Sequence, residues 1–298
     1  MKKKHHIYVV AGPTAIGKSD YAVELARSLS NGVAPFIDGE IVSADSRQIY
    51  SGLSIGTGTI SPEEMKGIPH HMLGIIEPGS SFSVVGYQKL ALPIIMDIIS
   101  RGKTPIICGG TGQYIDALIY TTPFPVVPPN TILREELETC STEELYIRLE
   151  SKDKERASAI DTHNRVRLIR ALEIVDVLGT VPAQGDKELR FPTTLYLLTV
   201  PKELLVQRIE KRLEKRLQGK DESPMLSEAK MLRTKNLSDR TIESLGLEYK
   251  WMNIYFKGEC SYDEMKKHIL VDSWHYVKRQ MTWNKKYESF AEKVEVEK

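Results

Sequence analysis

Residues 9–22 of the chain read VVAGPTAIGKSDYA and contain, over residues 12–19, the pattern G-x-x-x-x-G-K-[ST] of a phosphate-binding loop. The apolar, largely β-branched residues 7–10 before the loop predict a buried strand, and residues 20–29 place apolar side chains on one face of a helix. A phosphate loop requires this order of strand, loop and helix. The stretch therefore predicts that phosphate groups bind here. It leaves open whether a phosphoryl group is transferred, a nucleotide is hydrolysed or the phosphates depart as a leaving group.

The residue types of the loop explain how it would hold an anion. Gly12 and Gly17 allow successive backbone N–H groups to turn toward the ligand, and the following helix adds the positive end of its dipole. Lys18 supplies a point charge, and the Ser19 hydroxyl can bind Mg²⁺. We predict a phosphate site with Mg²⁺ as cofactor. The alternative is a glycine turn without a ligand.

Two further strands are predicted to end beside this loop. The strand candidate at 40–44, EIVSA, leads into Asp45-Ser46-Arg47-Gln48, and the one at 105–108 leads into Gly109-Gly110-Thr111-Gly112. Strands that alternate with helices indicate a parallel sheet covered on both faces, whose ligands bind beyond the carboxyl ends of the strands. We therefore expect these loops and the phosphate loop to meet.

The middle and the end of the chain have a different character. A proline-rich connector at 122–129 precedes a charged helical pattern, after which an apolar strand is predicted at 194–200. Further helices are expected to about residue 287, with a frayed charged tail at 292–298. The predicted fold is α/β, a P-loop NTPase-like parallel sheet flanked by helices, with an all-helical insertion and a helical C-terminal region. The expected boundaries are 1–122 for the first part of the core, 123–190 for the insertion and 191–298 for the rest.

The composition is that of an ordinary globular protein. The 298 residues are 41% hydrophobic and 27% charged, and the net charge of +1 provides no global field toward nucleic acid. The three cysteines lie far apart in the sequence, which argues against a zinc module or a disulfide framework. No apolar run has membrane-spanning length and no signal-peptide core follows the N-terminal lysines, so we expect a cytoplasmic protein without a membrane partner.

Two polar residues at the predicted strand ends are candidates for chemistry. Asp45 could hold Mg²⁺ or act as a general base, or it could cap a turn with Ser46. Thr111 follows two glycines that allow close approach to a ligand, so its hydroxyl could orient a substrate. A simple helix N-cap is an equally good interpretation of Thr111.

Three basic segments lie outside the predicted sheet, at 163–170, 202–220 and 278–283. The second contains the cluster Arg208, Lys211, Arg212, Lys215 and Arg216, and the third combines Lys278 and Arg279 with Trp283. Each alone could be a solvated helix face. Together, in a chain with balanced charge, they favour a groove for a polyanion.

These motifs together resemble those of the tRNA dimethylallyltransferase family, whose members prenylate the adenosine just after the anticodon. The resemblance spans nearly the whole chain, and the motifs follow the family's order. The stretches that carry it are the phosphate loop with its strand, EIVSADSRQIYSGLSIGTG at 40–58, GIPHHMLGIIEP at 67–78, FSVVGYQKLA at 82–91, PIICGGTGQYIDAL at 105–118, HNRVRLIRALEI at 163–174 and VKRQMTW at 277–283.

The resemblance implies a reaction. The loop would grip the diphosphate of dimethylallyl diphosphate, which departs as pyrophosphate while the adenine N6 amine attacks the cation-like carbon. Breaking the allylic C–O bond builds negative charge on the diphosphate, and the loop amides, Lys18 and Mg²⁺ would stabilise that charge. The resemblance assigns removal of the amine proton to Asp45 and a place along the reaction channel to Thr111. With Lys18 these are the predicted catalytic residues.

The resemblance also implies the binding residues. Those for the diphosphate are Gly12, Pro13, Thr14, Ala15, Ile16, Gly17, Lys18 and Ser19, with Ser19 also the metal ligand. Those for tRNA are Asp45, Ser46, Arg47, Gln48, Thr111, Arg165, Arg167, Arg170, Lys278, Arg279 and Gln280. The implied partners are dimethylallyl diphosphate and the anticodon stem-loop of tRNA, which the insertion would clamp, and we expect a monomer.

Three C-terminal segments depart from the family's usual pattern. Residues 219–226 and 245–250 are longer than usual, and Trp274-His275 replaces an Arg-Gln pair. Two alternatives therefore stay open. One is a dimethylallyltransferase acting on free AMP, ADP or ATP, which would have little need of the basic insertion, and the other is a tRNA-binding paralogue without catalysis. A nucleotide or metabolite kinase is less favoured, because nothing resembles an arginine-rich lid.

Overall fold

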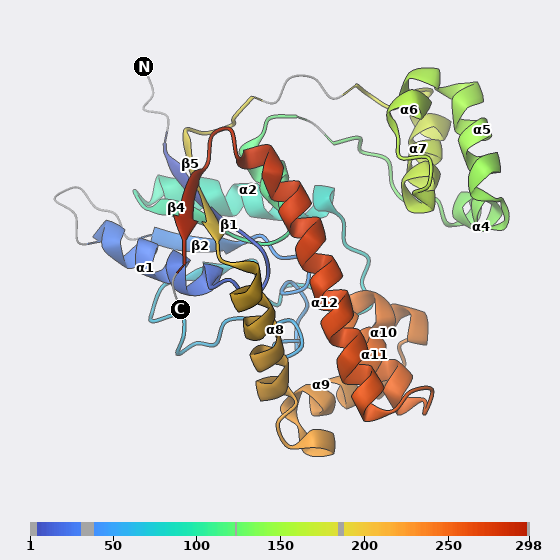
Figure 1. Cartoon of the computed structure of the whole chain (residues 1–298). Helices are drawn as coiled ribbons and strands as arrows, with labels where there is room; N and C mark the ends of the chain where they lie inside the picture. Colours follow the sequence, from blue (N-terminus) through green and yellow to red (C-terminus); the bar gives the residue numbers. More distant parts are fainter. Residues whose placement is uncertain (1–4, 31–38, 123, 184–187, 297–298) are drawn as a thin grey trace. The chain divides into compact units, whose positions relative to one another are not determined.

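Six strands form one parallel sheet in the order β3-β2-β4-β1-β5-β6 (Figure 1). The computed structural model describes residues 5–30, 39–122, 124–183 and 188–296. The strands are β1 (Ile7–Ala11), β2 (Gly39–Ser43), β3 (His70–His71), β4 (Thr104–Gly109), β5 (Thr193–Thr199) and β6 (Glu292–Glu295). β1 lies at the centre, with Val9 opposite Ile107 on one side and Leu195 on the other. Because all strands are parallel, their carboxyl ends meet at one edge.

The four strands predicted from apolar runs are confirmed, but the predicted frayed tail at 292–298 is wrong over its described residues. Glu292–Glu295 pair with Tyr196–Thr199 of β5, and the Val296 N–H donates to the Thr199 carbonyl at 2.9 Å. Val294 and Val296 alternate with charged residues, so that both pack on the same core cluster while the charges face outward. This part of the predicted tail is therefore an edge strand; residues 297–298 lie outside the described part.

Helices cover both faces of the sheet. On one face, α2 (Val84–Ser100) and α3 (Gly112–Ile119) pack on alternate strand residues in a cluster that includes Tyr87, Ile95 and Leu118. On the other face, α1 (Lys18–Ser30) and α8 (Lys202–Arg216) complete a second cluster. A sheet buried on both faces needs continuous apolar strands, which explains why these strands were readable in the sequence.

The C-terminal helices form a third cluster of their own. They are α9 (Pro224–Arg233), α10 (Asp239–Leu245), α11 (Leu247–Phe256) and α12 (Tyr262–Asn284), with short 3₁₀ turns at Lys220–Glu222 and Lys285–Tyr287. The long helix α12 begins with a capping box between Ser261 and Glu264. Further along α12, Val277 joins the core under α1 and α8, and the following Tyr287 joins the core under α2 and α3. The C-terminal helices are therefore tied to both faces of the sheet.

Residues 121–188 form a separate compact unit, and residues 1–120 and 189–298 form the other. The smaller unit contains α4 (Thr131–Thr139), α5 (Thr142–Lys152), α6 (Lys154–Ala159) and α7 (Arg165–Leu178). Its core contains Leu137, Leu145, Leu149, Leu168 and Leu172. The last helix ends at Gly179, whose φ of 80° suits a glycine C-cap. The insertion is thus all-helical, with its own hydrophobic core.

Within the described part of the chain, none of the helices combines the length and the apolar character that crossing a membrane requires.

Candidate functional site

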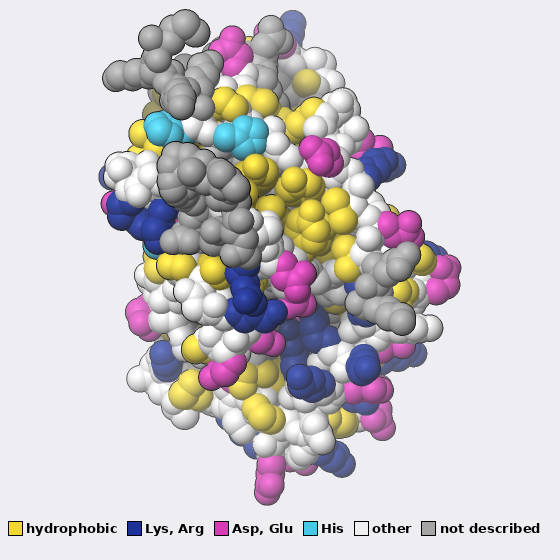
Figure 2. Space-filling view, turned by 90° about the vertical axis from the view of Figure 1, so that its left-hand side faces the viewer, with side chains coloured by type: hydrophobic (Ala, Val, Ile, Leu, Met, Phe, Trp, Pro, Cys, Tyr) yellow, Lys and Arg dark blue, Asp and Glu magenta, His cyan; other side chains and the backbone are white. Residues whose placement is uncertain are grey.

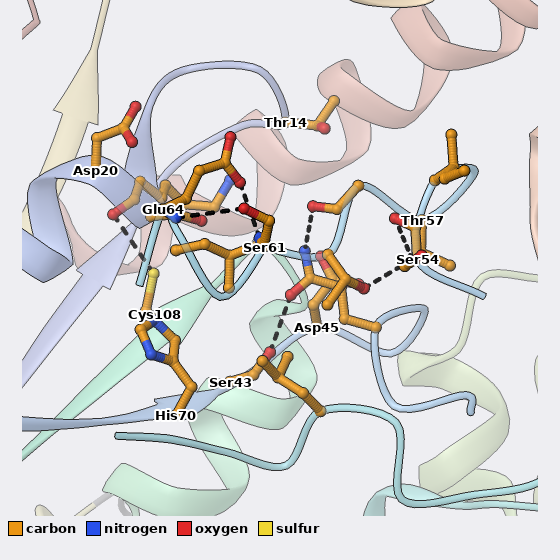
Figure 3. Close-up of a pocket in the computed structure, with 18 of the residues that line it drawn as sticks. Thr14, Asp20, Ser43, Asp45, Ser54, Thr57, Ser61, Glu64, His70 and Cys108 are labelled. Atoms are coloured by element: carbon orange, nitrogen blue, oxygen red, sulfur yellow. Dashed lines mark hydrogen bonds between the residues drawn. The ribbon is translucent and has the colours of Figure 1, made fainter. Parts of the chain in front are cut away.

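A cavity of about 770 Å³ lies at the edge where β1, β2 and β4 end. Asp20, His70 and Cys108 line one end of it, and Asp45, Ser54 and Thr57 line the other (Figure 3). The loop after β1 contributes Thr14, Ala15, Gly17, Lys18 and Ser19 to its wall. The loops that follow β2 and β4 lie in contact: the Thr111 N–H donates to the Ala44 carbonyl at 3.0 Å. The predicted meeting of the three loops is confirmed.

The phosphate loop has the backbone of an anion cradle. Gly12, Ala15 and Gly17 have positive φ values of 154°, 62° and 97°, and such alternation turns neighbouring N–H groups inward. The Lys18 ammonium donates to the Pro13 carbonyl at 2.8 Å, and burial lowers the pKa of Lys18. An ammonium that is desolvated in this way is stabilised by an arriving anion. Ile16 packs inward in the core under α1 and so anchors the loop.

Helix α8 adds cations that the sequence identified only as a basic cluster. On the face that Figure 2 shows, Lys and Arg side chains gather around a hollow. Arg212, Lys215 and Arg216 line the cavity beside the phosphate loop, and Arg208 donates to the Ile16 carbonyl at 3.1 Å. Burial, with the neighbouring Arg216, lowers the pKa of Arg212 to about 10. The Glu248 carboxylate lies 3.9 Å from Arg216 and compensates part of this positive charge, and an arriving anion would stabilise the two guanidinium groups further.

The cavity wall opposite the phosphate loop is residues 54–59. The stretch 40–58 carries the family resemblance, but no site residue was predicted within this segment. Glu228 of α9 is 7% exposed and accepts from the N–H groups of Ser54, Ile55 and Gly56 at 2.7, 2.9 and 2.8 Å. It also accepts from the Tyr249 hydroxyl at 2.6 Å. The Gly56 carbonyl then accepts from Arg216 at 3.2 Å. The C-terminal helices thus hold this wall and one of its cations.

Asp45 faces two spaces at once. It lines the large cavity and also a second hollow of about 110 Å³, together with Arg47, Glu248, Tyr276 and Arg279. Its Oδ1 accepts from the Arg47 N–H at 2.8 Å, so the turn-capping interpretation is also realised. That bond uses one of about four acceptor positions of a carboxylate. The group therefore keeps the capacity to accept a proton from a ligand in either space.

Thr111 supports Asp45 by bonding Ser46, the residue that follows Asp45. Thr111 is the N-cap residue of α3, but its side chain makes no capping hydrogen bond. Instead its Oγ1 accepts from the Ser46 N–H at 3.0 Å and donates to the Ser46 hydroxyl at 3.3 Å. The Thr111 N–H also donates to the Ala44 carbonyl at 3.0 Å, so Thr111 bonds the residues on both sides of Asp45.

The remaining residues after β2 are engaged with other loops. The Arg47 guanidinium donates to the Ser244 and Leu245 carbonyls at 2.6 and 3.0 Å, at the end of α10. The Gln48 amide donates to the Gly58 carbonyl at 3.1 Å and its oxygen accepts from Ser43 at 3.3 Å. Gln48 nevertheless lines the large cavity, and Arg47 the small one.

The predicted arginines of the insertion differ in whether their guanidinium groups already have partners among the described residues. Arg165 donates to the Leu137 and Glu138 carbonyls at 2.9 and 2.7 Å, at the end of α4. Arg170 donates to Glu173 at 3.1 Å and to the Val127 carbonyl at 2.8 Å. Arg167 is exposed, and its guanidinium has no hydrogen-bond or ion-pair partner among the described residues. Arg167 is therefore the member of the three that is free to meet another molecule.

The predicted basic run on α12 likewise contains both exposed side chains and one that is buried and bonded. Lys278 and Arg279 are exposed, and Arg279 lies over the Tyr276 ring at 5.7 Å and lines the smaller hollow. Gln280 is 4% exposed and bonds only backbone groups of the described chain: its Oε1 accepts from the Thr14 N–H at 2.8 Å, and its Nε2 donates to the Gly110 carbonyl at 2.9 Å. The structure therefore places Gln280 against the phosphate loop and the loop that follows β4.

The cavity wall offers a few oxygen ligands for a metal ion. Among the described residues, no group of three or more His, Cys, Asp or Glu side chains could hold a metal ion by itself. The cavity wall does contain the Ser19 hydroxyl and the carboxylates of Asp20 and Asp45. Mg²⁺ commonly uses one or two protein oxygens and takes its other ligands from phosphates and water. The residues present fit a Mg²⁺ ion that arrives with a phosphate ligand.

Comparison with known protein families gives two matches. The family described as IPP transferase matches residues 48–287, and the one described as Isopentenyl transferase matches residues 5–74. The chain is 40% identical over 282 residues to the tRNA dimethylallyltransferase of Anoxybacillus flavithermus, covering 93% of this chain and 86% of that protein. It is 37% identical over 289 residues to that of Bacillus subtilis, covering 94% and 88%.

Solved structures show the same similarity. The full-length tRNA isopentenylpyrophosphate transferase of Bacillus halodurans superposes with a TM-score of 0.70 at 32% identity, covering 98% of this chain and 90% of that one. A eukaryotic dimethylallyltransferase acting on tRNA gives a TM-score of 0.81 at 23% identity, covering 98% and 74%. The second likeness supports the fold.

Proposed function

The chain belongs to the IPP transferase family, and on that premise we propose that it transfers the dimethylallyl group from dimethylallyl diphosphate to N6 of the adenosine 3′-adjacent to the anticodon in tRNA, releasing pyrophosphate. The named relatives are tRNA dimethylallyltransferases. The observation that carries the proposal is the position of Asp45, which lines both the cation-walled cavity and the smaller hollow. A general base in that position can reach an amine that enters the smaller hollow while the diphosphate ester is held in the larger cavity.

The large cavity suits the diphosphate. The loop amides, Lys18, Arg212 and Arg216 are preorganised donors around one space, and they would stabilise the charge that develops on the leaving group. Their burial strengthens each interaction, because little water screens it. When bound, Mg²⁺ would neutralise part of the same charge, held by Ser19 with Asp20 or Asp45.

The smaller hollow suits the adenine amine. Its wall contains Asp45, Tyr276 and Arg279. The adenine can enter only if it is flipped out of the RNA stack, as chemistry on a nucleobase requires. The exocyclic amine is a weak nucleophile because its lone pair is delocalised into the ring. The Asp45 carboxylate would accept its proton as the new C–N bond forms. Thr111 and Ser46 would keep that carboxylate in place.

The exposed cations would contact the RNA. Lys278 and Arg279 lie on α12 near the smaller hollow, and Arg167 lies on the insertion with its guanidinium free among the described residues. Contacts of this type fix the position of an RNA stem without reading its sequence. We place the reaction in the cytoplasm, where unmodified tRNA is available.

The test is a set of incubations with Mg²⁺ and radiolabelled dimethylallyl diphosphate, given unmodified total tRNA, AMP or ATP, followed by nucleoside analysis. The proposal predicts label in prenylated adenosine from tRNA alone. Label only in the free nucleotide would identify an adenylate dimethylallyltransferase. Absence of label while tRNA still binds would identify a catalytically inert tRNA-binding paralogue.

A further inference from the structure

Gln280 touches two catalytic loops that lie far from it in sequence. Its amide accepts from Thr14, 266 residues away, and donates to Gly110, 170 residues away. Both partners are backbone groups, and the side chain is buried. An RNA phosphate could not easily reach this amide, because the side chain is 4% exposed and both of its bonded atoms face the loops.

The fit around Gln280 is tight. A Cβ added to Gly110 would lie 2.1 Å from the Gln280 Nε2, so glycine is needed there for the contact. Trp283 lies one turn after Gln280 on α12, and a Cβ added to Gly112 would lie 2.0 Å from its ring. The Tyr287 hydroxyl then donates to the Gly112 carbonyl at 3.2 Å. Residues from successive helical turns therefore pack against the loop that follows β4.

The two ends of the amide are chemically different, and each matches its partner. The oxygen meets an N–H and the nitrogen meets a carbonyl, so the group can sit in only one orientation. Because the Thr14 N–H is occupied by Gln280, it is fixed in place and withheld from the ligand. Thr111, the residue after Gly110, bonds both neighbours of Asp45: its N–H donates to the Ala44 carbonyl and its Oγ1 accepts from the Ser46 N–H, each at 3.0 Å.

We propose that Gln280 is a positioning residue that sets the separation between the diphosphate on the phosphate loop and the Asp45 carboxylate. The inference rests on the proposed function and deepens it. It reassigns Gln280 from the tRNA contacts suggested by the sequence to the scaffold of the reacting groups. Displacement of reacting groups by about 1 Å can reduce a rate by about 100-fold.

The test compares Gln280→Glu and Gln280→Met with Met281→Ala, which changes an exposed neighbour on the same helix. Gln280→Glu keeps the acceptor for Thr14 but opposes the Gly110 carbonyl with a second oxygen, and Gln280→Met keeps the length without either bond. Single-turnover transfer at saturating tRNA gives a rate constant, which reports positioning, and an amplitude, which reports the folded fraction. Filter binding of an anticodon stem-loop and calorimetric binding of pyrophosphate are measured in parallel.

We expect both Gln280 variants to lower the rate constant by about 10- to 100-fold and to weaken pyrophosphate binding by about tenfold, the effect of losing one buried hydrogen bond. Stem-loop affinity should match that of Met281→Ala. A large loss of stem-loop affinity with an unchanged rate constant would make Gln280 an RNA contact, and a lower amplitude alone would make its role merely structural; either overturns the proposal. If the unaltered chain transfers no label, the proposed function fails, and pyrophosphate binding still decides the role of Gln280.

Discussion

Replacing Glu228 by glutamine removes one acceptor oxygen from a place where four donors converge. Oε2 accepts from the N–H groups of Ser54 and Ile55, and Oε1 accepts from the Gly56 N–H and the Tyr249 hydroxyl. A glutamine must put its NH₂ in one of these positions. Since an NH₂ group cannot accept, at least one of the donors loses its partner.

The arrangement predicts which orientation the glutamine adopts. With NH₂ at the Oε2 position, the two part-buried backbone N–H groups of Ser54 and Ile55 would be left without an acceptor. With NH₂ at the Oε1 position, the Tyr249 hydroxyl can rotate and accept, and only the Gly56 N–H is left unpaired. The second orientation is cheaper, and one unpaired buried donor costs about 1–3 kcal/mol. At about 2–4 °C per kcal/mol for a chain of this size, the melting temperature should fall by several degrees.

The functional consequence follows from the wall that Glu228 supports. The Gly56 carbonyl holds Arg216, so a displaced wall should weaken the grip on the diphosphate. We expect the KM for dimethylallyl diphosphate to rise by about threefold to tenfold, the equivalent of roughly 1 kcal/mol, with unchanged tRNA affinity. Calorimetric melting and steady-state kinetics measure both effects, and Glu222→Gln, an exposed carboxylate nearby, is the control. A melting temperature within a degree of the control, with an unchanged KM, would refute the reasoning.

Three further changes test other parts of the site and fold. Asp45→Asn should lower turnover about 100-fold or more, the usual contribution of a general base, while tRNA binding in a filter assay stays nearly intact; unchanged turnover would remove Asp45 from that role. Arg212→Ala should raise the KM for dimethylallyl diphosphate by about 10- to 100-fold, because it removes a charged hydrogen-bond donor, and an unchanged KM would exclude Arg212 from the donor site. Hydrogen bonds from Arg101, with smaller contributions from His71 and Lys103, lower the pKa of Glu40 to about 2. The resulting stabilisation, up to about 3 kcal/mol, is present above about pH 4.5 and is lost as the pH falls toward 2. Urea unfolding across this range should show a smaller pH dependence in Glu40→Gln, and an equal dependence would contradict the assignment.

The sequence predicted the centre of the fold better than its edges. Strands β1, β2, β4 and β5 are apolar on both faces, so their composition alone marks them. β6 contains one valine among charged residues and becomes a strand only because β5 offers a free edge. β3 has two residues, too few for any pattern to indicate. Edge strands depend on partners that a local pattern does not contain.

The same distinction applies to the site. The phosphate loop and Asp45 are local motifs, so spacing was enough to identify them. The basic cluster on α8 was visible as charge, but its direction toward the cavity depends on how α8 packs under β1 and β5. Glu228 and Gln280 gave no readable signal of their backbone contacts, because those backbone groups lie more than 150 residues away. A side chain that bonds distant backbone atoms leaves no periodic trace in its own segment.

The departures from the family pattern reach the site through its scaffold. The long segment 219–226 leads into α9, which carries Glu228, and the long turn at 245–250 carries Tyr249 and Glu248. The Glu248 carboxylate lies 3.9 Å from Arg216 and lines the smaller hollow. Trp274 packs in the core under α1 and α8, beneath the Lys202 ammonium at 5.6 Å. Since Tyr249 and Glu248 contact Glu228 and Arg216, which hold a wall and a cation of the large cavity, changes in the segments 219–226 and 245–250 should alter donor affinity before they alter the choice of RNA.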